Sequence, residues 1–489
     1  MSENYDWRKL PVILKRFRLD DKLRWCSYYA SSVSSDWRYD MERLNGEPHP
    51  FPWELNLIAM LAIAGKEYDT QVVTKNIFHK FINTIRTAIP FSRGDDFESV
   101  VLHFLMAPQL LYQVDVRIFL TRYFYIFTHS EVHLDSIVEK KLDVPYCNLL
   151  GLAVMAWALG VNNQSISMEL SNLYRNKNVI VADRMRRAIS ALSLDRETFV
   201  VKQIEKINSS KRGYILADNI LEQFPFLRRG DAFILPLPYL LKNAVSIGLL
   251  HRITSGESVG LRAEIGKKII EEYVYEIMKY SGCYDFVSRE IKYRRNGRDS
   301  PDVIAYKNDT CVFMEVKFKK PILKLRTLDP DDEEGLDKMC AQAIAQVYRG
   351  IIERKEYIKE RTFSDDNVFG LVVLFEEPNL SRSRIFAVLA KEHPEWDDVT
   401  IAYIKRHIRV VSLYDIEVIC FRHHDVIGVL KQYYAGSEKD LFNLTFYSMD
   451  DASMVKNLDI FSFQKMLDYA TQGFLEMIQN SQIEKILEQ

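Results

Sequence analysis

Residues 300–319 read SPDVIAYKNDTCVFMEVKFK, and this stretch decides how the second half of the chain is expected to fold. Two short runs rich in β-branched and aromatic residues flank a tight polar turn at residues 307–309, which predicts a β-hairpin. Such a hairpin brings the carboxylates of Asp302 and Glu315 and the ammonium of Lys317 to one end. Paired carboxylates suit a hard divalent cation, which activates a water for attack. The stretch therefore predicts phosphodiester hydrolysis.

Side chains alternate between the two faces of a β-strand, and this alternation sorts the residues at the end of the hairpin. Glu315 and Lys317 are expected on one face, while Val316 points away and offers its backbone carbonyl to a metal ion. We expect Mg²⁺ held by Asp302 and Glu315 and still carrying several waters, with Mn²⁺ able to substitute. Lys317 would orient the attacking water or stabilise charge on the transition state.

The sequence on either side of the hairpin predicts an α/β unit. Residues 261–280 form an amphipathic helix whose apolar stripe is Ile265, Ile269, Tyr273 and Ile277. The continuous apolar run at 368–375 is typical of a central strand covered on both faces. The remaining expected elements are strands at 286–294, 302–306, 310–318 and 407–412, helices at 336–355 and 384–392, and an acidic loop at 329–337.

This order, with Pro-Asp opening one strand and Glu-x-Lys closing the next, resembles the PD-(D/E)xK nuclease superfamily over about residues 259–412. The resemblance implies an α/β restriction-endonuclease-like domain. Within it, Asp302 and Glu315 match the metal-binding acids of the family and Lys317 matches its catalytic lysine. The implied activity is that of a Mg²⁺-dependent DNA endonuclease, and the implied setting is bacterial restriction or anti-phage defence.

The same resemblance implies further site residues on the two flanking helices. A glutamate on the upstream helix usually completes the site. Glu271 is the first choice for this catalytic acid and for an additional metal ligand, while its neighbour Glu272 stays open. On the helix after the lysine, Gln342 and Gln346 are four residues apart, hence on one helical face, and are expected to support the site.

Positive charge is concentrated around this candidate site. Residues 287–326 contain eleven Lys or Arg against five acids, although the whole chain has a formal net charge of only −2. A run of charged residues is usually a solvated surface. Around an acidic metal site, however, it indicates a surface that binds a phosphate backbone. The expected nucleic-acid contacts are Arg294, Arg295, Arg298, Lys319, Lys320 and Lys324.

The chain has 489 residues, which predicts two or three domains. We expect a multidomain protein with a mostly α-helical N-terminal region at 1–207, a hairpin and helix connector at 214–255, the nuclease domain at 256–412 and a helical C-terminal region at 413–489. Helices are expected at 52–63, 70–88, 97–127 and 148–159, a linker at 208–213 and a small hairpin at 224–235. The N-terminal region is expected to bind protein partners or a second copy of the chain.

Several other classes of protein are disfavoured. The six cysteines are too widely spaced for a Cys-based zinc site or a disulfide framework, which fits a cytoplasmic protein. Residues 1–10 lack the apolar core of a secretory signal, and the apolar run at 149–161 is too short to span a membrane, so it is expected to be a buried helix. No nucleotide-binding glycine loop is present. Adjacent histidines at 423 and 424 point apart, which argues against a metal cluster there.

Two alternatives to a DNA nuclease stay open. One is a binding or scaffold module that keeps the nuclease fold without turnover, although the intact Asp302, Glu315 and Lys317 argue against it. The other is an RNA nuclease, which dependence of cleavage on the 2′-hydroxyl would reveal.

Overall fold

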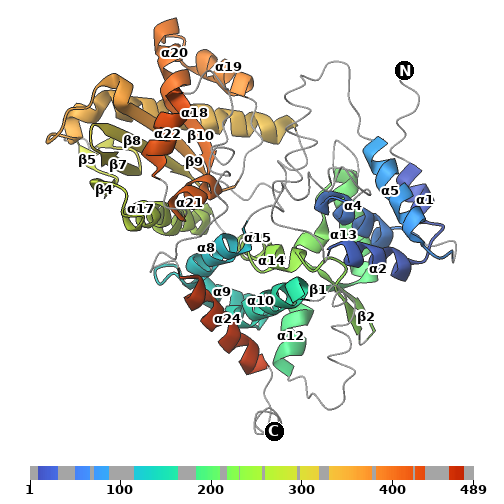
Figure 1. Cartoon of the computed structure of the whole chain (residues 1–489). Helices are drawn as coiled ribbons and strands as arrows, with labels where there is room; N and C mark the ends of the chain where they lie inside the picture. Colours follow the sequence, from blue (N-terminus) through green and yellow to red (C-terminus); the bar gives the residue numbers. More distant parts are fainter. Residues whose placement is uncertain are drawn as a thin grey trace, which may run out of the picture. The chain divides into compact units, whose positions relative to one another are not determined.

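The computed structural model describes residues 9–30, 50–66, 71–87, 115–162, 183–209, 217–230, 232–255, 259–293, 298–318, 330–376, 382–421, 425–435 and 462–477. Across these residues the chain is mostly helical, and a mixed five-stranded sheet lies within residues 286–412 (Figure 1). The chain divides into two compact units. The first comprises Met1–Thr128, His133–Ser255 and Phe463–Gln489, and the second comprises His129–Val132 and Gly256–Ser462.

One hydrophobic core of the first unit lies among helices near the N-terminus. Helices α1 (Lys9–Leu14), α2 (Leu19–Ala30), α4 (Pro52–Ala64) and α5 (Lys75–Thr87) pack around it, and α13 (Arg196–Ser209) packs on α4. Glu54 of α4 is buried, and Nε of Arg86 on α5 lies 2.6 Å from its Oε1. A buried carboxylate needs such a partner, because an unpaired charge in an apolar core is costly.

A three-stranded sheet borders this core. Strands β2 (Phe226–Arg229) and β3 (Ala232–Ile234) form the hairpin predicted at 224–235, and it turns at Gly230, whose φ of 58° suits glycine. Strand β1 (Ser193–Asp195) pairs in parallel with β2. The sequence did not predict β1, since three residues carry too little periodicity to recognise.

The rest of the first unit is a second group of helices. They are α8 (Val116–Thr128), α9 (Leu134–Leu142), α10 (Tyr146–Asn162), α12 (Asp183–Ala191), α14 (Leu240–Ala244), α15 (Ile247–Thr254) and α24 (Phe463–Met477). Helices α10 and α24 touch backbone to backbone. A Cβ atom on Gly151 would lie 2.6 Å from the carbonyl oxygen of Ala470, and one on Gly473 would overlap the backbone of Cys147. Glycine is therefore required at both crossings.

The predicted helices of the first unit are confirmed where the structure describes them. The prediction at 52–63 corresponds to α4 and that at 148–159 to α10, whereas the helix predicted at 70–88 begins only at Lys75. Of the helix predicted at 97–127, the described part is in α8, and residues 97–114 lie outside the described residues. Most of the expected linker, from residue 210 onward, also lies outside them. None of the described helices is both long and apolar enough to cross a bilayer.

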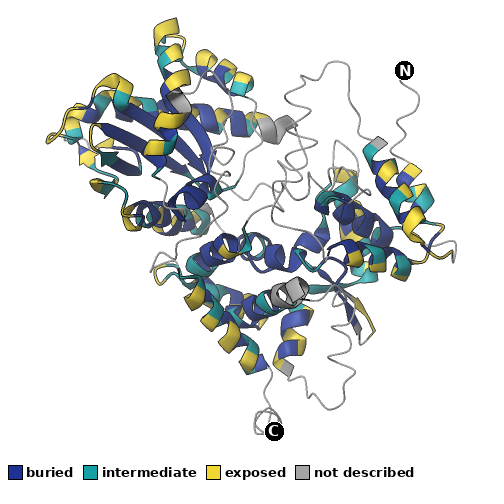
Figure 2. Ribbon diagram, viewed as in Figure 1, coloured by how far each residue is buried: buried dark blue, intermediate teal, exposed yellow. Residues whose placement is uncertain are grey.

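The second unit is built on the five-stranded sheet, in the order β10-β9-β8-β7-β4. These strands are Ile408–Ser412, Val368–Leu374, Thr310–Lys317, Val303–Lys307 and Phe286–Arg289 in that order. β10, β9 and β8 are parallel, whereas β7 is antiparallel to both β8 and β4. Every residue of β9 is buried, which confirms the predicted central strand, and Figure 2 shows the middle of the sheet as continuously buried.

Helices cover both faces of this sheet (Figure 1). α18 (Pro330–Tyr357), α19 (Arg382–Glu392) and α20 (Asp398–His407) share a hydrophobic core with one face. α17 (Glu271–Tyr280) and α21 (Leu413–Phe421) pack together on the other face, where the Tyr273 hydroxyl donates a 2.7 Å hydrogen bond to Glu417. α22 (Val426–Ala435) follows α21.

Three details of this unit differ from the expectation. The strand predicted at 286–294 is two strands, β4 and β5 (Lys292–Tyr293), because the chain leaves the main sheet at Ile291 and β5 pairs with β6 (Arg298–Asp299) instead. The prediction of an acidic loop at 329–337 was wrong from residue 330 onward, because α18 begins there. Acidic residues stabilise the first turn of a helix. Helix α20 was not predicted.

The amphipathic helix predicted at 261–280 is confirmed, and its four stripe residues are fully buried. It is continuous through α16 (Val259–Glu264), a π-helical stretch at Ile265–Ile270 and α17. The π-helical stretch ends immediately before Glu271. A Cβ atom on Gly266 would lie 3.3 Å from the Cβ of Phe318, so this stretch packs against the end of β8. Such wide turns often occur at functional sites.

Candidate active site

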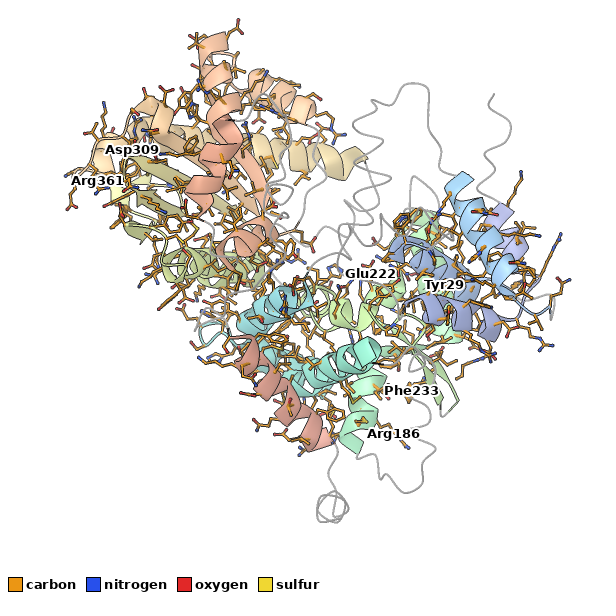
Figure 3. The ribbon with its side chains drawn as sticks, viewed as in Figure 1. Tyr29, Arg186, Glu222, Phe233, Asp309 and Arg361 are labelled. Carbon is orange, nitrogen blue, oxygen red and sulfur yellow. The ribbon has the colours of Figure 1, made fainter. Side chains whose placement is uncertain are left out.

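The predicted hairpin forms, and its two ends differ in character. At the closed end, Asn308 has a left-handed φ of 53°, which asparagine tolerates, and its carbonyl accepts a 2.7 Å hydrogen bond from Arg361. Figure 3 labels Arg361 and Asp309 there. At the open end the ladder stops at the Val303–Met314 pair. The candidate catalytic residues lie beyond that pair, at the opposite end from the turn.

The open end is held by a hydrogen bond from backbone to side chain. The N–H of Val316 donates to Oδ2 of Asp302 over 2.7 Å, so the aspartate takes the place of the next backbone acceptor in the ladder. Asp302 follows Pro301, and Pro301 packs on α18 where a Cβ on Gly350 would lie only 2.5 Å from the proline ring. The sheet and α18 together therefore position Asp302.

Glu315 and Lys317 lie on one face of β8, as the alternation predicted. Oε1 of Glu315 is 2.6 Å from Nζ of Lys317, and Glu315 is only 8% exposed. This salt bridge compensates the charge of the buried carboxylate and fixes the positions of both side chains. Lys317 itself is half-buried, so its ammonium can still meet a ligand.

The backbone direction at Val316 also agrees with the predicted metal-ligand role. The carbonyl of Lys317 accepts a hydrogen bond from Phe375, beyond the end of β9, so it points toward β9. Successive carbonyls of a strand point to opposite sides, and the carbonyl of Val316 therefore points to the side of Asp302. Two carboxylates and one carbonyl thus gather at the open end of the hairpin.

Glu271 joins this group, whereas Glu272 does not. Burial and then the charge of Asp302 raise the pKa of Glu271 to about 8, with Glu290 and Glu315 adding to the effect. The carboxylate of Glu272 instead holds the guanidinium of Arg289, with Nε 2.6 Å from Oε2. Of the two acids that the sequence left open, Glu271 is the one in electrostatic contact with the hairpin end.

Asp302 shows the same crowding of negative charge. Burial first and then the carboxylate of Glu315 raise its pKa to about 7, against the opposing effect of the Val316 N–H. Buried carboxylates that repel one another hold protons more tightly, and a bound cation would relieve the repulsion.

An open pocket of about 240 Å³ lies beside the hairpin end. Asp302 and Glu315 form one part of its wall. Glu290, just before β5, and Asp299, at the end of β6, form another, and burial followed by Asp299 raises the pKa of Glu290. Arg349 of α18 lines the side formed by that helix. The pocket is therefore strongly acidic, with cations at its margin.

The supporting and nucleic-acid-binding residues predicted from the sequence have different outcomes. Gln346 lines the pocket, but Gln342, one helical turn earlier and exposed, does not. Arg298 lines the pocket and pairs with Glu353 of α18 at 2.5 Å. The other five predicted contacts lie outside the described residues: Arg294, Arg295, Lys319, Lys320 and Lys324.

The site fits Mg²⁺ through few protein ligands. Across the described ranges, no three His, Cys, Asp or Glu side chains converge closely enough to hold a metal ion. Mg²⁺ is usually bound by one or two carboxylates and keeps several waters. Asp302 and Glu315 each use one oxygen for a protein hydrogen bond, and within the described part of the chain their other oxygens accept none. Those two oxygens and the Val316 carbonyl can serve as ligands.

Four charged residues in or beside the pocket were not predicted. Arg349 and Glu353 lie three and seven positions after Gln346, so extending the predicted polar stripe along the same helical face would have found them. Glu290 and Asp299 carry no such local signal, because a hairpin with only two residues in each strand brings them to the pocket.

No protein-family model matches this chain, and no curated protein matches its sequence.

Proposed function

We propose that this chain is a metal-dependent nuclease of the PD-(D/E)xK type that hydrolyses phosphodiester bonds in DNA. The observation that carries the proposal is the meeting of Asp302, Glu315 and Lys317 at the open end of one hairpin, beside an acidic pocket that the two acids line. Glu271 is near enough for the charge of Asp302 to raise its pKa. The resemblance of the sequence motif to that superfamily supports the same conclusion, as well as a role in bacterial restriction or anti-phage defence.

Each residue then has a chemical task. Asp302, Glu315 and the carbonyl of Val316 would hold Mg²⁺. When bound, the ion supplies a Lewis acid for the scissile phosphate and a lower pKa for the attacking water. Lys317, held 2.6 Å from Glu315, orients that water or stabilises the negative charge of the transition state. Glu271 holds a proton at neutral pH and releases it as pH rises through about 8, because its pKa is raised to about 8, so it can take part in proton transfer at the site.

The test compares the full chain with Lys317→Ala on supercoiled, linear and single-stranded DNA and on RNA, each in Mg²⁺, Mn²⁺ or EDTA. Lys202→Ala, an exposed lysine of α13, is the matched control. We expect metal-dependent cutting of DNA that Lys317→Ala loses by at least about 100-fold, as for loss of a group that stabilises transition-state charge. The control should cut normally.

The other outcomes separate the alternatives. Cutting of RNA alone, dependent on the 2′-hydroxyl, would identify an RNA nuclease. Binding of nucleic acid without cutting, unchanged by Lys317→Ala, would identify a binding module. Equal cutting by the wild type and Lys317→Ala would exclude this site as the source of the activity.

A further inference from the structure

One face of α18 looks into the pocket. Gln346, Arg349, Gly350 and Glu353 recur at three- and four-residue spacing and therefore share that face. The first three line the pocket. Because Gly350 has no side chain, α18 approaches Pro301 closely, and this contact holds the neighbouring Arg349 at the pocket that contains Asp302.

In the described part of the chain, Arg349 has no partner for its charge. Four residues later on a helix, a glutamate usually pairs with an arginine, and Glu353 occupies that position. Its two oxygens are used by the β5–β6 hairpin instead: the hydroxyl of Tyr293 donates to Oε2, and Nη1 of Arg298 lies 2.5 Å from Oε1. Among the described residues, no acid forms an ion pair with Arg349.

Within the described lining of the pocket, Arg349 is therefore a cation without a paired acid, beside several acids. Arg298 also lines the pocket, but Glu353 neutralises it. A polynucleotide that enters must bring its phosphates past Glu290 and Asp299 as well as Asp302. Guanidinium binds phosphate through two parallel hydrogen bonds, which makes an unpaired arginine the suitable group at such a wall.

We propose that Arg349 forms a phosphate-binding subsite that takes a phosphate of the substrate strand next to the one being cut. The inference rests on the proposed nuclease function and narrows its substrate class: the enzyme acts on polynucleotides that carry a phosphate beside the scissile one. Gln346, on the same helical face and also lining the pocket, borders the subsite.

The test measures KM and kcat for DNA cleavage at several salt concentrations. It uses the wild type, Arg349→Ala, Arg349→Lys and a matched control, Arg186→Ala. Arg186 is an exposed arginine on α12, labelled in Figure 3. Both arginines are exposed, so all variants should keep the wild-type melting temperature, as is usual for surface changes.

Arg349→Ala should raise KM about tenfold and reduce the slope of log KM against log salt by about one, because one phosphate contact is lost. Its kcat should stay within about threefold, since that contact is present before and during the reaction. Arg349→Lys should recover part of the affinity, because it keeps the charge without the planar fork. Arg186→Ala should match the wild type.

Two results would overturn the proposal, and they differ. If the wild type cuts DNA and Arg349→Ala has the same KM and the same salt slope, the subsite is wrong while the nuclease function stands. If the wild type cuts no nucleic acid in Mg²⁺ or Mn²⁺, the proposed function fails and the subsite fails with it.

Discussion

The backbone N–H of Val316 donates a 2.7 Å hydrogen bond to the carboxylate of Asp302, which joins the start of β7 to the end of β8. Asp302 therefore closes the hairpin in addition to being a candidate metal ligand. The two tasks use different properties of the side chain: the first needs an acceptor oxygen, whereas the second needs a negative charge.

Two substitutions at Asp302 separate these tasks. Asp302→Asn keeps an acceptor for the Val316 N–H, so its stability should stay close to that of the wild type. Asp302→Ala leaves that donor without a protein acceptor and should cost about 1–3 kcal/mol of unfolding free energy. Both should lose cleavage by about 100-fold or more, because the proposed metal ligand is gone. Urea denaturation measures the stability of the two variants, and cleavage assays measure their activity. Equal stability of the two variants would contradict the role of the Asp302–Val316 hydrogen bond in holding the hairpin.

The raised pKa of Glu271 predicts how stability depends on pH. The folded state holds its proton up to about pH 8, whereas an unfolded glutamate releases it near pH 4.5. The stabilising contribution of this group is therefore complete at low pH and is lost as pH rises through about 8. Glu271→Gln, a neutral isostere, should match the wild type at pH 4 and exceed its stability at pH 9 by on the order of 2 kcal/mol.

Chemical denaturation in EDTA at pH 4, 7 and 9 measures the unfolding free energy of both proteins. The difference between the two values is compared across pH, because titrating groups that the two proteins share contribute equally to both. Glu360→Gln, at an exposed position after α18, is the control and should show no such difference. A constant difference between Glu271→Gln and the wild type at all three pH values would show that Glu271 does not share the crowded site.

Glu353 is expected to support the pocket without contacting the substrate. It accepts hydrogen bonds from Tyr293 of β5 and Arg298 of β6, so it fastens both strands of the small hairpin to α18. Glu353→Ala should release that hairpin and lower cleavage about tenfold. Mg²⁺ should raise the melting temperature of Glu353→Ala as much as that of the wild type, because Asp302 and Glu315 remain in place.

Glu353→Gln keeps one of the two acceptor oxygens and replaces the other with an NH2 group. Its cleavage activity should therefore lie between those of the wild type and Glu353→Ala. Glu360→Ala serves as the exposed control. Full cleavage activity in Glu353→Ala would show that the hairpin needs no attachment to α18.

Much of the second unit was predictable because its signals are local. The apolar run of β9, the four-residue stripe from Ile265 to Ile277 and the strand-turn-strand pattern around Asn308 each lie within one element, and each is confirmed. The acids in the first turns of α18 were misassigned as a loop. Their composition resembles a loop, but acids also favour the first turn of a helix.

The part of the site that lies within one hairpin was also predictable from the sequence. Asp302, Glu315 and Lys317 belong to one hairpin, so their meeting follows from strand geometry alone. The choice between Glu271 and Glu272 required the structure, because Glu272 pairs with Arg289 whereas Glu271 interacts with the charge of Asp302. The availability of Arg349 likewise depends on a tertiary contact, since Glu353 is four residues away in sequence yet bound elsewhere.

The packing of α24 on α10 through Gly151 and Gly473 changes what the second unit is. Because α24 belongs to the first unit, the sheet-containing unit is an insertion, entered after Ser255 and left before Phe463, rather than a module appended in series. Both of its ends are tethered to the same body. Removing α24 would therefore expose the face of α10 that carries Gly151 in the first unit, rather than shorten the sheet-containing unit.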